Sequence, residues 1–305
     1  MKTVVIFCRN IAADQAPFND PYYWNGYQDL LLAVKARGAK AYFATGNDTY
    51  KGGGVFSEAF TVDNKQPVEK FQRVADVKAD VVYEKGGFEG RDVLVLNPPF
   101  VHDITSSKIE TNKHFGKYQP LTIVCQTRAQ VEAAFEKIPG DMIVVKEPEG
   151  NGGKYVQIGK KADILPTAST NYPVVVQQFV DTSGGVKGLV EGIHDLRIKM
   201  GGGKVWGGKF RIAAPGEMRA NVSQGASEKF LYPDEIPAEA VKLAKEIDPF
   251  FKDYPRYYAL DFALTSDGWK LIELNAKPGL EPADLDERSK FVVDQLAAYL
   301  IEICQ

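Results

Sequence analysis

Three oxygen-bearing side chains near the end of the chain have a spacing that suits a metal ion. Asp261 lies in the apolar stretch 257–264, and Glu273 and Asn275 follow a turn-like segment at 265–268. Residues two apart on a strand face the same side, and a hairpin would bring Asp261 beside them. Carboxylate and amide oxygens suit Mg²⁺, which also keeps room for phosphate oxygens. An ordinary polar strand face is the alternative, but the apolar neighbours of Asp261 favour a metal site.

A lysine followed by a glycine-rich loop is the second candidate. Lys146 ends an apolar stretch, where a bare charge needs an anionic partner. Gly150, Gly152 and Gly153 lack Cβ atoms, so their backbone N–H groups can approach phosphate oxygens. A plain hairpin turn is the alternative for this loop. Residues 203–209 match G-x-x-x-x-G-K, but the expected Ser or Thr is missing and the context is a hairpin, so we reject a P-loop there.

Basic residues form the third candidate. Arg197 follows a His-Asp-Leu sequence, Arg211 ends a strand-like stretch, and Arg219 stands two residues before Asn221. The forked guanidinium group suits carboxylate and phosphate ligands. Surface charge is the alternative for any one of these arginines.

The elements that must position these residues change in type along the chain. The first part alternates strands with helices, which indicates parallel βαβ units and an α/β domain at residues 1–98, ending at a Pro-Pro pair. Its strands are predicted at 4–7, 39–44 and 92–96, and its helices at 27–37 and 67–77.

Hairpins dominate the rest of the chain. They are predicted from the strand pairs 141–145 with 155–158, 195–200 with 204–212, and 256–264 with 269–274. Helices are predicted at 107–116, 129–137, 237–251 and 290–304. We therefore expect antiparallel sheets in two further units, at residues 99–177 and 178–305.

Composition narrows the class of protein. The 305 residues carry 37 basic and 40 acidic side chains, a net charge of −3, and no Lys/Arg-rich run, so bulk-charge binding to nucleic acid or membrane is not expected. No apolar stretch is long enough for a membrane helix. Three widely spaced cysteines argue against a disulfide framework and favour the reducing cytoplasm.

Taken together and in order, these motifs resemble the ATP-grasp superfamily of carboxylate–amine ligases. The resemblance is strongest to the branch that contains prokaryotic glutathione synthetase and the ligases that add glutamate to a ribosomal protein's tail. It covers roughly residues 100–290 and rests on five stretches: Val144–Lys146 with the loop at 150–153, Gln177–Val180, His194–Arg197, Arg211 with Arg219-x-Asn221, and Asp261 with Glu273–Leu280.

The resemblance implies the ATP-grasp fold, an α/β (α+β) architecture. Residues 1–98 would be the preceding parallel α/β domain, residues 99–177 the lid subdomain and residues 178–305 the catalytic subdomain. The last two would clasp ATP between antiparallel sheets.

The resemblance also implies a role for each motif residue. ATP would be bound by Lys108, Lys146, Gly152, Gly153, Gln177, Gln178, Phe179, Val180 and Asp195, with Lys113 as a rival of Lys108 for a phosphate. Magnesium, as two ions with Mn²⁺ as a substitute, would be bound by Asp261, Glu273 and Asn275. Catalytic roles would fall to Arg211, Arg219 and Asn221, and substrate contacts to Arg197 and Arg219.

The implied activity is an ATP- and Mg²⁺-dependent ligase that converts a carboxylate into an acyl-phosphate and joins it to an amine. A non-catalytic ATP sensor and a carboxylate kinase on the same fold are the alternatives. Small-molecule or peptide substrates, or a protein tail, would be its partners, and relatives suggest a homo-oligomer. A dehydrogenase is disfavoured because no G-x-G-x-x-G follows the first strand.

Overall fold

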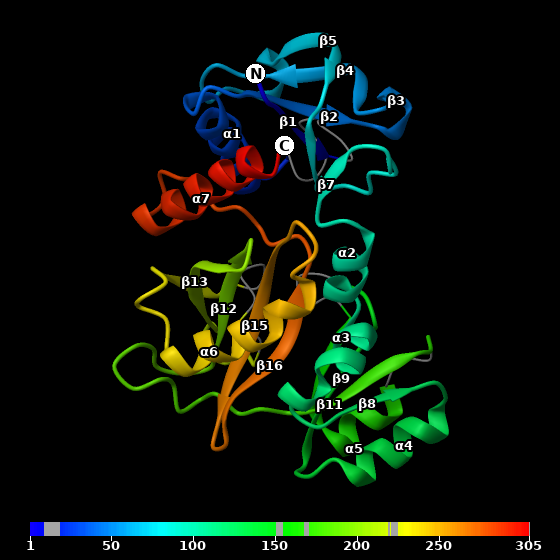
Figure 1. The fold of residues 1–305 in the computed structure, drawn as a ribbon. Helices are drawn as coiled ribbons and strands as arrows, with labels where there is room; N and C mark the ends of the chain where they lie inside the picture. Colours follow the sequence, from blue (N-terminus) through cyan, green and yellow to red (C-terminus); the bar gives the residue numbers. More distant parts are fainter. Residues whose placement is uncertain (9–18, 151–154, 168–170, 219, 221–224, 305) are drawn as a thin grey trace.

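Three β-sheets organise the chain in the computed structural model, which describes residues 1–8, 19–150, 155–167, 171–218, 220 and 225–304. The sheets follow one another from the N-terminal domain to the two smaller units below it in Figure 1. The predicted division of the chain into units at 1–98, 99–177 and 178–305 stays a prediction.

The first sheet has seven strands and mixes two pairing directions. Its strands are β1 (Thr3–Cys8), β2 (Lys40–Thr45), β3 (Tyr50–Gly52), β4 (Val55–Thr61), β5 (Gln72–Lys78), β6 (Val81–Glu84) and β7 (Leu94–Leu96). The strands in the order β2-β1-β6-β7 are parallel, as expected from the βαβ pattern. Strands β3, β4 and β5 pair antiparallel, which the sequence analysis did not predict.

The predicted helix at 67–77 is wrong. A short 3₁₀ turn at Val68–Lys70 leads into β5, which pairs along β4 at the sheet edge. The three-residue spacing of Val68, Phe71 and Val74 suggested a helix, but only Val77 of β5 is buried. Strand pairing therefore overrode a weak helical pattern.

Both ends of the chain build the core of the N-terminal domain. Helix α1 (Pro21–Ala36) and helix α7 (Glu287–Ile303) lie side by side next to β1 in Figure 1. Val4 and Ile6 of β1 pack in one core with Leu296 and Leu300 of α7. The intervening residues of β1 face a second core on the other side of the sheet. β1 is therefore buried on both faces, as its continuous apolar sequence predicts.

The second sheet is antiparallel, in the order β10-β9-β11-β8. Its strands are β8 (Thr122–Cys125), β9 (Met142–Lys146), β10 (Val156–Lys160) and β11 (Val174–Gln178). Helices α4 (Arg128–Lys137) and α5 (Lys161–Ile164) accompany it. The predicted hairpin is confirmed by the antiparallel pairing of β9 with β10. Its tip at 151–154 lies outside the described residues.

The third sheet carries charge on one face and apolar side chains on the other. It is antiparallel, with the order β14-β13-β12-β15-β16. Its strands are β12 (His194–Gly201), β13 (Lys204–Ile212), β14 (Ser227–Leu231), β15 (Tyr257–Thr265) and β16 (Gly268–Asn275). Leu196 and Leu260 pack against helix α6 (Ala238–Ile247), whereas the alternate residues Arg197 and Asp261 face the opposite side.

Two short helices join the first sheet to the second. Helix α2 (Pro99–Ser106) begins at the predicted Pro-Pro boundary, and helix α3 (Lys108–Phe115) follows it along β16. Within the described residues, no helix is both long enough and apolar enough to cross a membrane. Cys8, Cys125 and Cys304 are all buried free thiols.

Candidate active site

A cleft of about 950 Å³, counting the part that opens to solvent, separates the second sheet from the third. Its lining comes from both sides and from helix α3. One side supplies Val144, Lys146, Val156, Ile158, Gln177 and Gln178, and the other supplies Ile193, Asp195, Arg211, Asp261, Ala263, Ile272 and Glu273.

Apolar side chains face the cleft from both sheets. Val156 and Ile158 are alternate residues of β10 and therefore share one face. Ala263 and Ile272 lie on the other side, where the register of β15 with β16 shifts and leaves Ile272 without a paired residue. A flat ring system fits between two such apolar walls. The sequence analysis missed these residues, although the alternation at 156 and 158 was a usable signal.

Two lysines project into the cleft. The Lys146 Nζ atom, at the end of β9, is buried and donates to the Gln177 Oε1 atom at 2.8 Å. Burial lowers the pKa of Lys146, and the nearby ammonium of Lys108 adds to this, while the carboxylate of Glu273 opposes it. The Lys108 Nζ atom lies 4.0 Å from the Glu273 Oε2 atom. An anion bound here would meet two cations at once.

The rival lysine lies elsewhere. The Lys113 side chain is 64% exposed and pairs with Glu110 one helical turn away, whereas that of Lys108 is 11% exposed and lines the cleft. Geometry therefore favours Lys108 for the phosphate contact.

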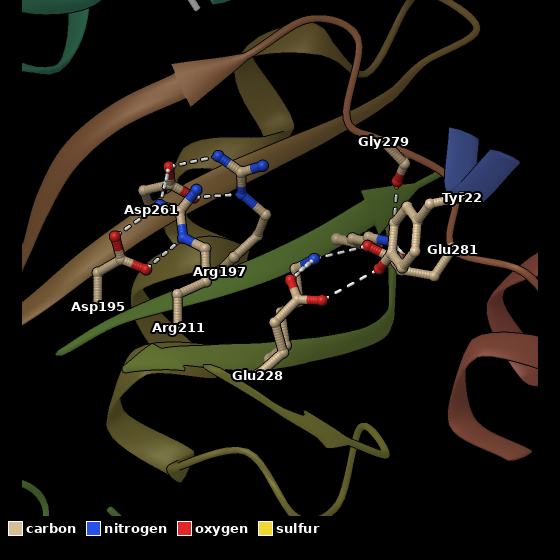
Figure 2. Close-up of polar contacts among 10 residues, drawn as sticks. Tyr22, Asp195, Arg197, Arg211, Glu228, Asp261, Gly279 and Glu281 are labelled. Atoms are coloured by element: carbon tan, nitrogen blue, oxygen red, sulfur yellow. Dashed lines mark hydrogen bonds and ion pairs between the residues drawn. The ribbon is translucent and has the colours of Figure 1, made fainter. Parts of the chain in front are cut away.

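Two arginines and two aspartates form what we call the arginine–aspartate cluster: Asp195, Arg197, Arg211 and Asp261 (Figure 2). The Arg197 Nε and Nη2 atoms donate to the two carboxylate oxygens of Asp261 at 2.7 and 2.6 Å. Arg211 donates to both oxygens of Asp195 at 2.6 Å and to Asp261 Oδ2 at 2.8 Å. Strand register explains the cluster, because Asp195 pairs with Arg211 and Arg197 with Asp261.

The cluster keeps Asp261 ionised. Burial alone would raise the pKa of its carboxyl, but the guanidinium groups of Arg197 and Arg211 outweigh burial and hold the pKa well below its usual range. The carboxylates of Asp195 and Asp261 raise the pKa of Arg211, although burial alone would lower it. A carboxylate and a guanidinium group that both keep their charge therefore line the cleft.

Hard oxygen donors meet where β15 pairs with β16. Asp261 stands directly opposite Glu273, and Asn275 shares their face one step along the strand. The Asn275 Oδ1 atom accepts the backbone N–H of Lys277 at 3.0 Å. No group of three or more His, Cys, Asp or Glu residues suited to a metal occurs in the described part of the chain. Two carboxylates still fit Mg²⁺ when phosphate oxygens complete its coordination.

The structure brings most of the predicted site residues together. Those that line the cleft are Lys108, Lys146, Gln177, Gln178, Phe179, Val180, Asp195, Arg211, Asp261 and Glu273. Arg197 and Asn275 lie on the charged sheet face beside the cleft without lining it. Gly152, Gly153, Arg219 and Asn221 lie outside the described residues. Of the motif Gln177–Val180, Gln177 and Gln178 end β11, and Phe179 and Val180 follow it as irregular chain.

Known sequences add independent information. Residues 109–300 match the RimK-like ATP-grasp domain. A probable alpha-L-glutamate ligase of Rhodopirellula baltica is 28% identical over 202 residues, which cover 64% of this chain and 47% of that protein. One of Shewanella halifaxensis is 32% identical over 203 residues, covering 64% of this chain and 41% of its own length. The chain thus spans about half the length of the curated relatives it matches, or less.

Solved structures share the fold over nearly the whole chain. A RimK domain ATP-grasp protein from Sphaerobacter thermophilus has a TM-score of 0.63 at 15% identity, covering 98% of this chain and 99% of that one. The ATP-grasp ligase PsnB, complexed with a variant of its minimal precursor, Mg and ADP, has a TM-score of 0.61 at 13% identity, covering 99% and 98%.

These comparisons confirm the ATP-grasp fold and the resemblance read from the motifs. The family match covers more than half of the chain and includes Lys146, the arginine–aspartate cluster and the β15–β16 carboxylates, whereas Lys108 lies one residue before it. The chain belongs to the RimK-like ATP-grasp family.

Proposed function

We propose that this chain is an ATP- and Mg²⁺-dependent ligase that activates a carboxylate as an acyl-phosphate and joins it to an amine. One observation carries the proposal: a single cleft places two lysines opposite two carboxylates and a buried arginine. The apolar walls suit the base of ATP, and the charged end suits its phosphates. Glutamate ligase activity in relatives and bound ADP and Mg in a structural neighbour agree with this assignment.

Charge neutralisation drives the first step. A carboxylate oxygen of the substrate attacks the γ-phosphorus of ATP, the bond to the ADP oxygen breaks, and an acyl-phosphate forms. Lys108 and Lys146 would hold the phosphates, while Arg211 stabilises the charge on the moving phosphoryl group. Asp261, Glu273 and Asn275 would hold Mg²⁺, which would supply positive charge close to the phosphates. The arginine–aspartate hydrogen bonds fix Arg211 before the substrate arrives, which limits the reorganisation needed during transfer.

Aminolysis completes the reaction. The amine nitrogen attacks the acyl carbon, the bond from that carbon to the phosphate oxygen breaks, and the amine loses a proton as the amide forms. Water would compete with the amine for the acyl-phosphate, so the two sheets must enclose the reacting groups. We assign substrate contacts to Arg197 and Arg219. We assign catalytic roles to Arg211, Arg219 and Asn221.

The substrates we propose are an amino acid or peptide carboxylate and an amine, with a protein tail as one form of either. Arg211 in the lining and Arg197 beside the cleft favour anionic substrates. We further propose two bound Mg²⁺ ions, replaceable by Mn²⁺, a homo-oligomeric assembly and a cytoplasmic location. The three buried free thiols agree with a reducing compartment.

The decisive experiment measures ADP release with Mg²⁺ against pools of amino acids and short peptides. An Asp261→Ala/Glu273→Ala double variant serves as the inactive control. Pool-dependent release that vanishes in this control supports phosphoryl transfer to a carboxylate. Mass spectrometry of the product then separates an amide, as expected for a ligase, from the acyl-phosphate or phosphorylated product of a carboxylate kinase.

A matched pair of lysine variants separates binding from turnover. Lys108→Met should weaken ATP binding about tenfold by removing one phosphate contact, whereas Lys113→Met, on the exposed side of the same helix, should leave it unchanged. Tight ATP binding without ADP release from any pool would favour the sensor. Absence of Mg²⁺-dependent ATP binding would contradict the proposed function.

A further inference from the structure

A second charged cluster lies on the same face of the third sheet, one step farther along the strands than the arginine–aspartate cluster. We call it the lysine–glutamate cluster: Lys199, Lys209, Glu228 and Glu281. Lys199 follows Arg197 by two residues on β12, and Lys209 stands directly opposite Arg197 on β13. Figure 2 shows the two clusters side by side, with Tyr22 of α1 at the far end.

Glu281 is the centre of this cluster. One oxygen of its carboxylate pairs with the Lys199 ammonium, and the other accepts from Lys209 Nζ at 2.7 Å. Lys199 also donates to the Gly279 carbonyl at 3.1 Å. Lys209 additionally pairs with Glu228. Glu281 therefore fixes both lysines from a loop that follows the predicted metal-binding strand.

The cluster is buried and electrically balanced. The side chains of Lys199 and Glu281 are each 4% exposed, and two ammonium groups are matched by two carboxylates. Burial alone would raise the pKa of Glu281, but the two ammonium groups outweigh burial and hold the pKa well below its usual range. Loss of the Glu281 carboxylate would leave one buried ammonium group without a matching negative charge, and pairing with another carboxylate would then be favoured.

Glu228 stays paired with Lys209, and Asp261 is a second carboxylate on this face of the sheet. Lys199 pairs with Ala259, so Asp261 is its diagonal neighbour on the same face. Diagonal neighbours lie about 7–8 Å apart, within reach of a long side chain, and Ala259 presents only a methyl group between them. Asp261 already accepts three hydrogen bonds from arginines. A carboxylate offers about four acceptor positions, so a further ammonium would occupy the last one.

We propose that Glu281 is a positioning residue that holds Lys199 away from Asp261 and so keeps one acceptor position of Asp261 open for a metal ion. This inference rests on the proposed function, in which Asp261 binds Mg²⁺. Glu281 touches neither nucleotide nor metal in this role. It acts through Lys199, and its effect is measured as a change in Mg²⁺ dependence.

The test compares ATP binding at increasing Mg²⁺ with ATP binding in EDTA, by calorimetry on the full chain. Glu281→Gln keeps the shape of the side chain and removes its charge. We expect the Mg²⁺ concentration for half-maximal tightening of ATP binding to rise about tenfold, because an added positive charge weakens cation binding nearby. ATP affinity in EDTA should change less than about twofold, since the lysines that face the phosphates are untouched.

A double variant tests whether Glu281 acts on Mg²⁺ dependence through Lys199. Lys199→Met/Glu281→Gln removes the competing ammonium and leaves the Lys209–Glu228 pair balanced, so Mg²⁺ dependence should return close to that of the unmodified chain. Lys199→Met alone should show normal Mg²⁺ dependence. Asp248→Asn is the matched control, because it breaks a different buried ion pair, with Arg256, in the same sheet region. It should lower thermal stability without changing Mg²⁺ dependence.

Distinct results overturn distinct claims. If folded Glu281→Gln retains normal Mg²⁺ dependence, or if the double variant is as impaired as the single one, the positioning role is wrong. If Glu281→Gln does not fold, altered Mg²⁺ dependence in Lys199→Met, or in a folded double variant, still refutes it. If the unmodified chain shows no Mg²⁺-dependent ATP binding, the proposed function itself fails, and the inference with it.

Discussion

The two charged clusters of the third sheet share one face but differ in the cations they use. The arginine–aspartate cluster borders the cleft and pairs each carboxylate with a guanidinium fork. The lysine–glutamate cluster lies beneath the N-terminal domain and pairs its carboxylates with ammonium groups. Arginine stays charged at every accessible pH and holds a fixed geometry, whereas lysine is a flexible point charge.

The difference indicates a division of labour between the clusters. Permanent, rigid charge stands where we propose phosphoryl transfer. The flexible, buried lysines lie where strands β12, β13 and β14 meet the loop that carries Glu281. Tyr22 donates its hydroxyl to Glu228 at 3.0 Å and so connects helix α1 to the sheet. Helix α1 also lies close to the loop that carries Glu281, because a Cβ atom at Gly26 would lie 2.0 Å from the Leu280 carbonyl oxygen.

The largest effect is expected from Asp261→Asn in the first cluster. An amide carries no charge, so it cannot neutralise two guanidinium groups and would bind Mg²⁺ more weakly than a carboxylate. ADP release should fall at least about 100-fold, comparable to the loss of a main electrostatic group in other active sites. Asp267→Asn, an exposed carboxylate in the turn of the same hairpin, is the control and should retain full activity. Near-normal activity in Asp261→Asn would remove Asp261 from the proposed mechanism.

Arg211→Lys tests whether turnover requires the forked guanidinium group or only its positive charge. The charge is kept, but the two-pronged contact to Asp195 and the contact to Asp261 cannot both form. We expect kcat for ADP release to fall about 10- to 100-fold while the Kd for ATP changes little. Arg288→Lys alters a similar forked pair, with Glu235, at the surface and should have no effect on kcat. Equal effects of the two variants would contradict the special role of the first cluster.

Lys146→Arg should change the pH dependence of ATP binding. Burial lowers the pKa of Lys146 below its ordinary value of 10.5, so its positive charge is lost at a lower pH than for an exposed lysine. ATP affinity should therefore weaken as pH rises through that lowered pKa. Arginine stays protonated, so the variant should hold its affinity, even if weaker by a few fold, to higher pH. Titrations of Kd between about pH 7 and pH 10, beside Lys113→Arg as control, provide the check.

The smallest effect is expected from Tyr22→Phe at the edge of the second cluster. The variant removes one partly buried hydrogen bond to the Glu228 carboxylate and nothing else. Urea denaturation should show a loss of about 1–2 kcal/mol in unfolding free energy. Mg²⁺ dependence should stay normal because the Glu281 contacts remain. Tyr155→Phe, at a side chain 66% exposed, should leave stability unchanged. A large kinetic effect of Tyr22→Phe would instead place α1 in catalysis.

Local sequence signals were enough to predict much of the third sheet. Alternating apolar and polar residues with a glycine turn predicted the β12–β13 and β15–β16 hairpins, and the structure has both. The same reasoning placed Asp261 on the strand beside Glu273 and Asn275. Strand β14 was missed because it is a short edge strand with largely exposed side chains. Strands β3 to β5 were missed because their pairing is not encoded in any one segment.

The partners of the site residues were beyond sequence reasoning. The pairing of Arg197 with Asp261 depends on strand register, which a single chain does not reveal. Glu281 lies in a loop without periodicity, and its ammonium partner Lys199 is 82 residues away. Likewise, the docking of α7 against α1 joins the two ends of the chain through apolar packing and an ion pair between Arg37 and Asp294. Residue type predicted the chemistry, whereas long-range packing decided the contacts.

The place of helix α7 in the first core has a consequence for how the protein forms. Val4 and Ile6 of β1 pack against Leu296 and Leu300 as well as against α1, so this core stays incomplete until α7 has been synthesised. The N-terminal domain is therefore completed only at the end of translation. Contacts of such long sequence separation slow folding and prolong the exposure of apolar surface. Newborn chains that stop before residue 287 are expected to be clients of chaperones.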